Sequence, residues 1–239
     1  MLKKNISIIT IHKGAINNLK KTLNSIDNQK VKNFKNYVIS PFLSKQEIKK
    51  FKQKYRIFII GKDKSLYNAM NIGLKNTWSD YILFLNSGDH FYNNNASHLI
   101  KLNLDKNCLI FKTVLKYKKR SLYPKKRFFY SNYYHPHPSF IRPPQLKQKI
   151  YFNEKYKIDA DSIWVNNNIS RYSSKKIFKN FSIHYLGGLS TSPNLETIKN
   201  YFSNSLYSGL KEMIKYLLFK LLGQIKYYQL IYKFKFNQK

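Results

Sequence analysis

The sequence feature that most limits how this chain can fold is the apolar run Tyr81-Ile82-Leu83-Phe84-Leu85, which ends abruptly at Asn86-Ser87-Gly88-Asp89. A continuous apolar run of this length is typical of a central strand that is covered on both faces. The residues before it, 69 to 75, favour a helix with its apolar positions on one face. Open α/β sheets bind their ligands at the carboxyl ends of such strands, where a glycine lets the backbone turn. The pattern therefore predicts a polar site at residues 86 to 89, although ordinary turn residues would also explain it.

Strand-like and helix-like segments alternate before this run. The predicted strands are Ile6–Ile11, Tyr37–Ile39 and Ile57–Ile60. Two helices are predicted between them, one capped by Asn17 or Asn18 and continuing to Ile26, the other from Gln46 to Tyr55. Strands that alternate with helices of this length imply a parallel sheet with right-handed crossovers. The predicted fold class is therefore α/β.

The pattern changes after Asp89. The predicted elements there are a helix at Ala96–Leu102, strands at Leu109–Tyr117 and Ser121–Phe129, a helix at Ile158–Asn168 and a strand or hairpin arm at Lys176–Leu186. Between them, the segment Tyr134–Ser139 is rich in proline and histidine, and a second proline pair follows at Pro143 and Pro144. Because proline lacks a backbone donor and restricts the residue before it, these segments are predicted to form a loop.

From Asn194 onward the sequence predicts a long helical region in which lysines interrupt leucine, isoleucine, phenylalanine and tyrosine. A hydrophobic helix with a cationic stripe suits the surface of an anionic membrane. A terminal helix packed on its own domain explains the same pattern equally well. The predicted organisation is one α/β domain at residues 1–192 and a basic, amphipathic helical region at residues 193–239.

The composition restricts the partners and the location of the chain. Its 239 residues carry 44 basic and 11 acidic side chains, which gives a formal net charge of +33. Such a surface concentrates anions, which include nucleic acids, anionic lipids and phosphorylated metabolites. The single cysteine, Cys108, excludes an intramolecular disulfide and a cysteine-based metal cluster. Neither a signal peptide nor an apolar stretch of about 18 residues is recognisable, so the expected location is cytoplasmic, at the inner face of the membrane.

The segment from Lys62 to Asp89 resembles the centre of the family 2 glycosyltransferases of the GT-A fold, especially the bacterial enzymes that build surface polysaccharides. Those enzymes commonly carry an Asp, a Gly-Ile-Tyr-Asp-Ala-Met-Asn-Lys-Gly helix and then Phe-Leu-Asn-Ser-Gly-Asp. The matching positions here are Asp63, Tyr67, Ala69, Met70, Asn71, Gly73 and Phe84–Asp89. Ser65 and Asn68 replace the usual Gly and Asp. The resemblance implies a GT-A fold, which has a Rossmann-like, mostly parallel central sheet flanked by helices, here with a C-terminal helical extension. It also implies an inverting, metal-dependent transfer from a nucleotide sugar.

The same resemblance assigns binding roles to polar residues near the strand ends. Asp89 matches the acid that binds Mn²⁺ or Mg²⁺, and Asn86 stands where many relatives have a second Asp. The residues expected at the nucleotide sugar are Thr10, His12, Asp63, Asn86 and His137. His137 belongs to a motif that ends at Arg142, a residue able to pair with an anion. His184 is a further candidate metal ligand, although a histidine packed within a strand is the simpler interpretation.

A second motif, Phe152–Asp161, resembles the family's Phe-Asn-Glu-x-Tyr-x-Ile-Ala-x-Asp run, whose final Asp deprotonates the acceptor hydroxyl. Asp161 is therefore the expected catalytic base. Asp159 is the alternative, although positions i and i+2 of a helix do not share a face. Either acid could instead be an ordinary salt-bridge partner. The motif Gly187–Ser190 matches a Gly-Gly-x-Ser element that could close over the bound donor, although an ordinary turn explains it equally well.

The expected function is surface polysaccharide synthesis, with a glycan or lipid-linked glycan as the acceptor. Departures from the family pattern leave a second hypothesis open, namely a degenerate, non-catalytic binding or assembly subunit. Relatives usually have Asp-Gly-x-Ser-x-Asp-Gly-Thr after the second strand, where this chain has Ser40–Ser44, and Lys13-Gly14 replaces an aromatic residue and Asn. A nucleic-acid binder is a third hypothesis, suggested by the charge together with 17 phenylalanines and 20 tyrosines. Any protein of this charge retains oligonucleotides, so only sequence- or structure-selective binding would support this hypothesis. We expect no specific nucleic-acid partner.

Overall fold

The computed structural model describes residues 5–61, 63–77, 80–117, 119–126, 129, 136–144, 149–156, 160–186, 193, 195–233 and 236–238. Within these residues the strands are β1 (Ile6–Ile11), β2 (Phe34–Ser40), β3 (Arg56–Ile60), β4 (Tyr81–Phe84), β5 (His90–Phe91), β6 (Cys108–Tyr117), β7 (Arg120–Pro124), β8 (Phe140–Arg142), β9 (Ser174–Tyr185) and β10 (Phe236–Gln238). The helices are α1 (Ile16–Asp27), α2 (Lys45–Phe51), α3 (Leu66–Lys75), α4 (Ala96–Asn103), α6 (Pro136–Ser139), α7 (Ala160–Tyr172), α8 (Leu195–Asn204) and α9 (Leu206–Lys233).

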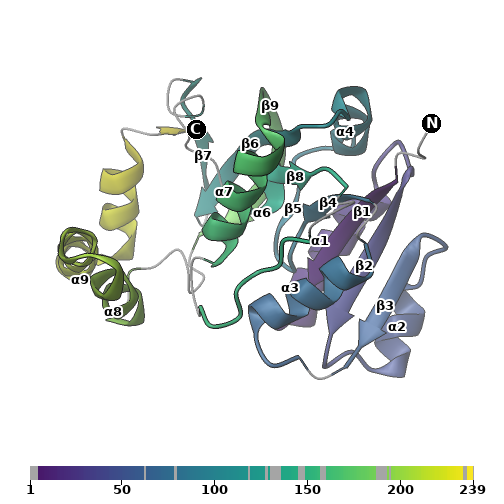
Figure 1. The fold of residues 1–239 in the computed structure, drawn as a ribbon, viewed down its shortest axis with the longest axis horizontal. Coiled ribbons are helices and arrows are strands. Elements are labelled where there is room, and N and C mark those ends of the chain that lie inside the picture. The colour runs from purple at the N-terminus through teal and green to yellow at the C-terminus, as the bar shows by residue number, and fades with distance from the viewer. Residues whose placement is uncertain are drawn as a thin grey trace.

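The amino-terminal half of the sheet is parallel and has the strand order β3-β2-β1-β4. The helices α1, α2 and α3 connect these strands, which confirms the predicted alternation and the α/β fold class (Figure 1). Several bounds differ from the prediction, and β2, for example, runs from Phe34 to Ser40. Neither Asn17 nor Asn18 caps α1, because the helix begins one residue earlier and its N-cap is Ala15. α2 ends at Phe51 instead of Tyr55, since the chain enters β3 at Arg56.

The strand β8 joins the parallel half of the sheet to the rest. It pairs antiparallel with both β4 and β6, and Ile82 of β4 lies opposite Arg142. β6 in turn pairs antiparallel with β7 and parallel with β9, and β10 pairs with the outer edge of β7. The strand predicted at Ser121–Phe129 is shorter than expected, because β7 ends at Pro124. The sheet is therefore parallel from β3 to β4 and mixed beyond it.

The loop predicted at the proline- and histidine-rich segment is wrong for the part that the structure describes. Pro136–Ser139 forms the short helix α6, and β8 follows it directly. Proline is compatible with the first turn of a helix, because the backbone donors of that turn have no partner within the helix. Pro143 and Pro144 follow β8 and lie outside regular structure, as expected. The segment thus leads directly into an interior strand of the sheet.

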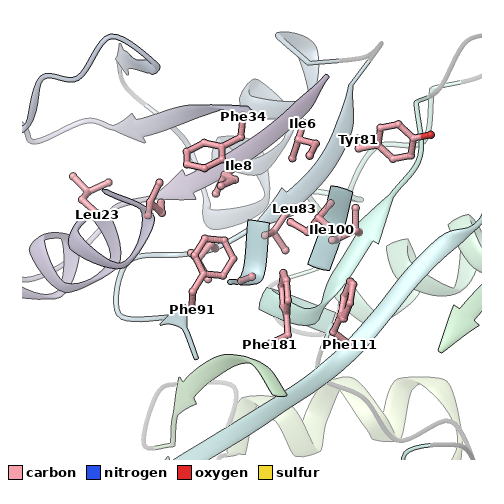
Figure 2. Packing of buried hydrophobic residues seen from close by; sticks show 14 of the residues in the cluster. Ile6, Ile8, Leu23, Phe34, Tyr81, Leu83, Phe91, Ile100, Phe111 and Phe181 are labelled. Carbon is pink, nitrogen blue, oxygen red and sulfur yellow. The ribbon is translucent and has the colours of Figure 1, made fainter. Parts of the chain in front are cut away.

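Each face of the sheet packs against its own hydrophobic cluster. One cluster joins Ile8 and Leu83 to side chains of α1, α2 and α4, and Figure 2 shows part of it. The other joins Ile9 and Ile82 to α3 and α7. Because successive strand residues point to opposite faces, both β1 and β4 are buried on two sides. The interpretation of the apolar run as a central strand is therefore confirmed.

The close packing of α3 on β1 depends on Gly73. A Cβ atom at this position would lie 2.6 Å from Cγ2 of Ile9. Any larger residue would force Ile9 to move, because protein interiors leave no room of this size. The glycine of the predicted helix face therefore sets the distance between α3 and the sheet.

Most of the C-terminal region is helical, as predicted, but Phe236–Gln238 near its end form the strand β10. Within α9 the backbone bends at Gly223, whose φ of 67° lies in the left-handed region that glycine adopts readily. Beyond the bend, Tyr227 and Tyr228 are buried against Leu115 and Leu122 of β6 and β7. The region is therefore attached at the opposite end of the sheet from β3 (Figure 1). None of the described helices is long and apolar enough to cross a membrane.

Candidate functional site

The turn that carries Asp89 is fixed by a side chain of α1. Thr22 donates from Oγ1 to the backbone carbonyl of Asp89 (2.6 Å) and accepts from the backbone N–H of Gly88 (2.9 Å). Gly88 has a φ of +107°, which permits the sharp reversal after β4. Thr22 is not among the residues predicted from the sequence. The available signal was a polar residue on the apolar face formed by Leu19 and Leu23 of the same helix.

Asp89 points to a histidine from the second half of the chain. The Oδ1 atom of Asp89 lies 2.6 Å from Nδ1 of His184 in β9, and the Asp89 residue is only 6% exposed. The pairing of β5 with β9 explains the contact, because His90 lies opposite Ile183 in an antiparallel register. Asp89 and His184 are therefore the next pair along these two strands. His184 is a histidine packed within a strand, as in its simpler interpretation, and it also contacts Asp89.

The protonation of His184 responds to two carboxylates. Burial lowers the pKa of His184, but the charges of Asp89 and Asp161 and the hydrogen bond to Asp89 more than offset that effect, so the pKa lies above its ordinary value. The cationic form can donate to Asp89. The Asp161 charge thus acts on the same imidazole that contacts Asp89, so Asp161 is electrostatically coupled to this pair.

Asp161 lies in the first turn of α7 and is partly exposed. Its Oδ1 accepts a hydrogen bond from the backbone N–H of Ser162 (2.9 Å). The positive end of a helix dipole favours the ionised form of an acid at this position. Asp161 is thus a carboxylate that solvent or a ligand can reach, in contrast to the buried Asp89.

Two asparagines of α3 hold the second motif against the first. Asn71 exchanges hydrogen bonds with the backbone of Phe152 (2.9 and 3.0 Å) and donates to Oε1 of Glu154 (2.8 Å). Asn68 donates to the other oxygen of Glu154 (3.0 Å). The ring of Phe152 stacks on Trp164 of α7, with 4.7 Å between the ring centroids. These contacts position α7, and with it Asp161, relative to the helix that precedes β4.

The two residues predicted to bind the nucleotide sugar at the end of β1, Thr10 and His12, have different surroundings. Thr10 has no exposed surface, and its Oγ1 accepts from Nδ2 of Asn36 in β2 (3.1 Å), so its side chain links two strands and does not face a ligand. His12 follows β1, and its Nδ1 lies 3.1 Å from Oγ of Ser87 in the turn after β4. Burial lowers the pKa of His12, with a smaller opposing effect of Glu47, so the ring is neutral near pH 7. Of these two residues, the structure brings only His12 to the Asn86–Asp89 turn.

Asp63 follows β3 and forms an ion pair with the ammonium group of Lys13, which follows β1. The side chain of Asp63 is 1% exposed and that of Lys13 is 30% exposed. The second oxygen of Asp63, Oδ2, is buried and has no hydrogen-bond partner among the described residues, and the same holds for Oδ1 of Asn86. Buried acceptors without a partner are costly, so these two oxygens mark places where a ligand or an ion would be stabilising.

The remaining predicted residues are less informative. His137 lies in α6, directly before the central strand β8, but the structure describes no more than its backbone. Asp159 and the motif Gly187–Ser190 lie outside the described residues. Arg142 is fully buried opposite Ile82, at the end of β4 that is remote from Asp89, and burial lowers its pKa to about 10. The structure therefore does not bring Arg142 to the candidate site.

The donor set at this site suits a divalent cation that is shared with a substrate. No group of three or more His, Cys, Asp and Glu side chains in the described part of the chain could hold a metal ion by itself. Asp89 offers a carboxylate, and Asn86 offers an amide oxygen without a partner among the described residues. Mg²⁺ is usually bound through one or two carboxylates together with substrate phosphates, and Mn²⁺ accepts the same oxygen ligands. The residues present therefore fit such an ion if phosphate oxygens complete its shell.

Comparisons with known proteins find a matching family model and solved structures of similar fold. A family model described as "Glycosyl transferase family 2" matches residues 7–180. Among solved structures, residues 1–349 of TarS from S. aureus in complex with UDP-GlcNAc are similar, with a TM-score of 0.57, 16% identity, and coverage of 93% of this chain and 77% of that chain. The same TarS fragment in complex with UDP has a TM-score of 0.55 at 16% identity, with 93% and 76% covered. At this identity the similarity concerns the fold alone. A search of curated proteins finds no significant match.

Proposed function

The chain belongs to glycosyl transferase family 2, and from this premise we propose that it transfers a sugar from a nucleotide diphosphate sugar to a hydroxyl group of a glycan acceptor. The observation that carries the proposal is the contact of Asp89 with His184, whose pKa the charge of Asp161 also raises. Such a transfer needs one group of residues for the leaving diphosphate and a carboxylate for the acceptor proton. Asp89 with His184 suits the first role, and the more exposed Asp161 suits the second.

In the proposed reaction Asp161 is the general base. Asp161 takes the proton of the acceptor hydroxyl, and the oxygen attacks the anomeric carbon of the donor sugar. The bond between that carbon and the diphosphate oxygen breaks in the same displacement, its electron pair leaves with the nucleoside diphosphate, and the configuration inverts. Asp159 remains the alternative base.

A divalent cation, Mn²⁺ or Mg²⁺, is part of the proposal. Asp89 and the amide oxygen of Asn86 would hold it, and when bound it would neutralise the charge that grows on the leaving diphosphate. The protein's own contribution is to orient these groups. Thr22 fixes the backbone of the turn and His184 fixes the carboxylate of Asp89.

The donor nucleotide is proposed to lie across the carboxyl ends of β1, β3 and β4, in contact with His12, Asp63 and Asn86 and close to His137. The buried, unpartnered oxygens of Asp63 and Asn86 support this placement. Thr10 would support the nucleotide site only as part of β1, because its side chain is fully buried. Because the similar TarS structures contain UDP-GlcNAc or UDP, a uridine nucleotide is the first donor to test.

The acceptor is proposed to be a lipid-linked glycan in the synthesis of a surface polysaccharide, which would place the protein in the cytoplasm at the inner face of the membrane. Residues 1–192 would form the transferase domain, and residues 193–239 would form the part that meets the anionic lipid surface. The proposed acceptor class rests on the family and on the resemblance of this sequence to members that build surface polysaccharides. The proposed location rests also on the net charge of +33.

A second candidate function is a non-catalytic subunit that binds sugars or assembles with other proteins. The ion pair between Lys13 and Asp63 favours this second function, because Oδ1 of Asp63 is bound to Lys13 and is not available to a nucleotide. The amide of Asn86 at a position where relatives carry an acid favours it as well, because it lowers the charge available to a cation.

Release of nucleotide from a panel of UDP-, GDP- and dTDP-sugars, with Mn²⁺ or Mg²⁺ and membrane lipid present, tests the proposal. We expect release from one donor class. Asp161→Asn and Asp89→Ala should abolish it while the fold survives, and Glu212→Gln on α9 is the matched control for the loss of one acid. Near-normal turnover of Asp161→Asn would remove that residue from the mechanism. Calorimetry that detects no metal-dependent binding of any donor would support the non-catalytic subunit.

A further inference from the structure

One face of α9 is apolar and open to solvent. The residues of this face recur every three or four positions and are called the α9 stripe: Leu206, Leu210, Met213, Ile214, Leu217 and Leu221. Leu221 is 81% exposed, Leu206 is 70% exposed and Ile214 is 56% exposed. Residues at this spacing lie on one side of a helix, so the stripe is a continuous surface about 15 residues long. Exposed apolar patches of this kind mark an interaction site.

The rest of the protein packs on other sides of α9. α8 contacts the helix at Gly209, where an added Cβ atom would lie 2.3 Å from the ring of Phe202. Leu218 and Phe219 are partly buried in the cluster that attaches α9 to the sheet. Nine residues, or two and a half turns, separate Phe219 from Leu210, so these side chains point in opposite directions. The stripe therefore lies on a side of α9 that neither α8 nor the sheet covers. The helix itself lies beyond the end of the sheet that carries β7 (Figure 1).

Cationic side chains border the stripe. Lys211 and Lys220 are exposed and flank it on its two sides at the angular spacing of an α-helix. The acid of α9, Glu212, is paired with Lys215, so it does not cancel the charge of Lys211 or Lys220. An apolar stripe with lysines along its margins is the pattern of a helix that lies in the interface of an anionic bilayer, with its ammonium groups at the phosphates.

We propose that the α9 stripe inserts into the surface of an anionic membrane, with Lys211 and Lys220 at the lipid phosphates. A second copy of the chain is a less suitable occupant, because it would bring two molecules of net charge +33 together. A membrane-spanning role does not apply to α9, since none of the described helices meets the length and apolarity needed. The proposal names the surface through which the enzyme of the previous subsection would meet a lipid-linked acceptor, but lipid binding itself does not depend on that activity.

Sedimentation with vesicles tests the proposal on the full chain. Vesicles of phosphatidylcholine alone are compared with vesicles that also contain phosphatidylglycerol, at low and at high salt. The variant Leu210→Gln/Ile214→Gln/Leu217→Gln keeps every charge, so it isolates the apolar contribution. We expect it to weaken binding to the anionic vesicles at least about tenfold at high salt, where purely electrostatic binding is screened. Leu102→Gln, at an exposed leucine of α4, is the control and should bind like the wild type.

Two outcomes would overturn the proposal. Equal binding of the triple variant and the wild type would mean that charge alone attracts the protein to lipid. Self-association in the absence of lipid that the triple variant abolishes would identify the stripe as a contact between copies. Nucleotide release with a water-soluble acceptor should be the same for the wild type and the triple variant, so a failure of the lipid-binding proposal is distinguishable from a failure of the transferase proposal.

Discussion

The Nδ1 atom of His184 lies 2.6 Å from Oδ1 of Asp89, although 95 positions separate the two residues. The antiparallel pairing of β5 with β9 sets this contact, because His90 and Ile183 are the adjacent pair. The acid that ends the central strand is thereby tied to the second half of the chain. The site is consequently built from both halves, with Asp161 acting on the same imidazole.

His184→Ala should reduce both stability and transfer. The substitution leaves the buried Asp89 carboxylate without this donor, which costs about 1–3 kcal/mol of the free energy of unfolding. Urea unfolding and nucleotide release measure the two effects. His98→Ala, at an exposed histidine of α4, is the control and should change neither. Full activity of His184→Ala would show that the contact is dispensable for the turn.

Lys13→Met should raise the KM of the donor and leave kcat nearly unchanged, because Lys13 orients Asp63 and does not reach the reacting atoms in the proposed mechanism. Lys13→Arg should restore donor affinity in part. In a double-mutant cycle with Asp63→Asn, we expect a coupling free energy of about 1 kcal/mol or more for donor binding. Lys64→Met changes a neighbouring exposed lysine and is the control. Additive effects of the two substitutions would contradict a role through the pair.

Thr22→Val should lower kcat more than it changes donor affinity. Valine has nearly the same shape but cannot bridge the N–H of Gly88 and the carbonyl of Asp89, so the turn loses its fixed geometry. A loss of about 1–3 kcal/mol of stability is expected for the unsatisfied backbone groups. Thr77→Val removes an equally buried hydroxyl that donates within α3, far from the turn. If both variants lose stability and keep the same kcat, the bridge does not serve catalysis.

Stability above about pH 10 should depend on Tyr227. Burial, with smaller effects of Glu212 and Tyr228, raises the pKa of Tyr227 to about 12. Because the folded state holds the phenol proton more tightly than the unfolded state, this contribution to stability is complete below about pH 10 and is lost as the pH rises toward the folded pKa. Tyr227→Phe should therefore lose less stability than the wild type between about pH 9 and pH 11 in urea unfolding. Tyr207→Phe, at an exposed tyrosine of the same helix, should behave like the wild type.

Much of the fold follows from local pattern. The run Tyr81–Leu85 predicted a strand buried on both faces, and the structure has β4 between β1 and β8 with a hydrophobic cluster on each face. Periodicity is sufficient here because the alternation of burial along a strand is a property of consecutive residues. The failure at Pro136–Ser139 has the opposite cause. Proline argues against regular structure on average, but the first turn of a helix tolerates it, and β8 gains its place in the sheet from partners far away in the sequence.

By itself, the sequence determined the α/β alternation, the polar turn that ends at Asp89 and, through a motif, the second acid Asp161. Only the tertiary structure decided which groups these acids meet. The contacts of Asp89 with His184 and of Gly88 with Thr22, and the ion pair of Lys13 with Asp63, each join residues that are far apart in the sequence. Side-chain periodicity specifies which residues are buried, but the partner of a buried polar group depends on strand order and register. These are fixed only when the whole sheet assembles.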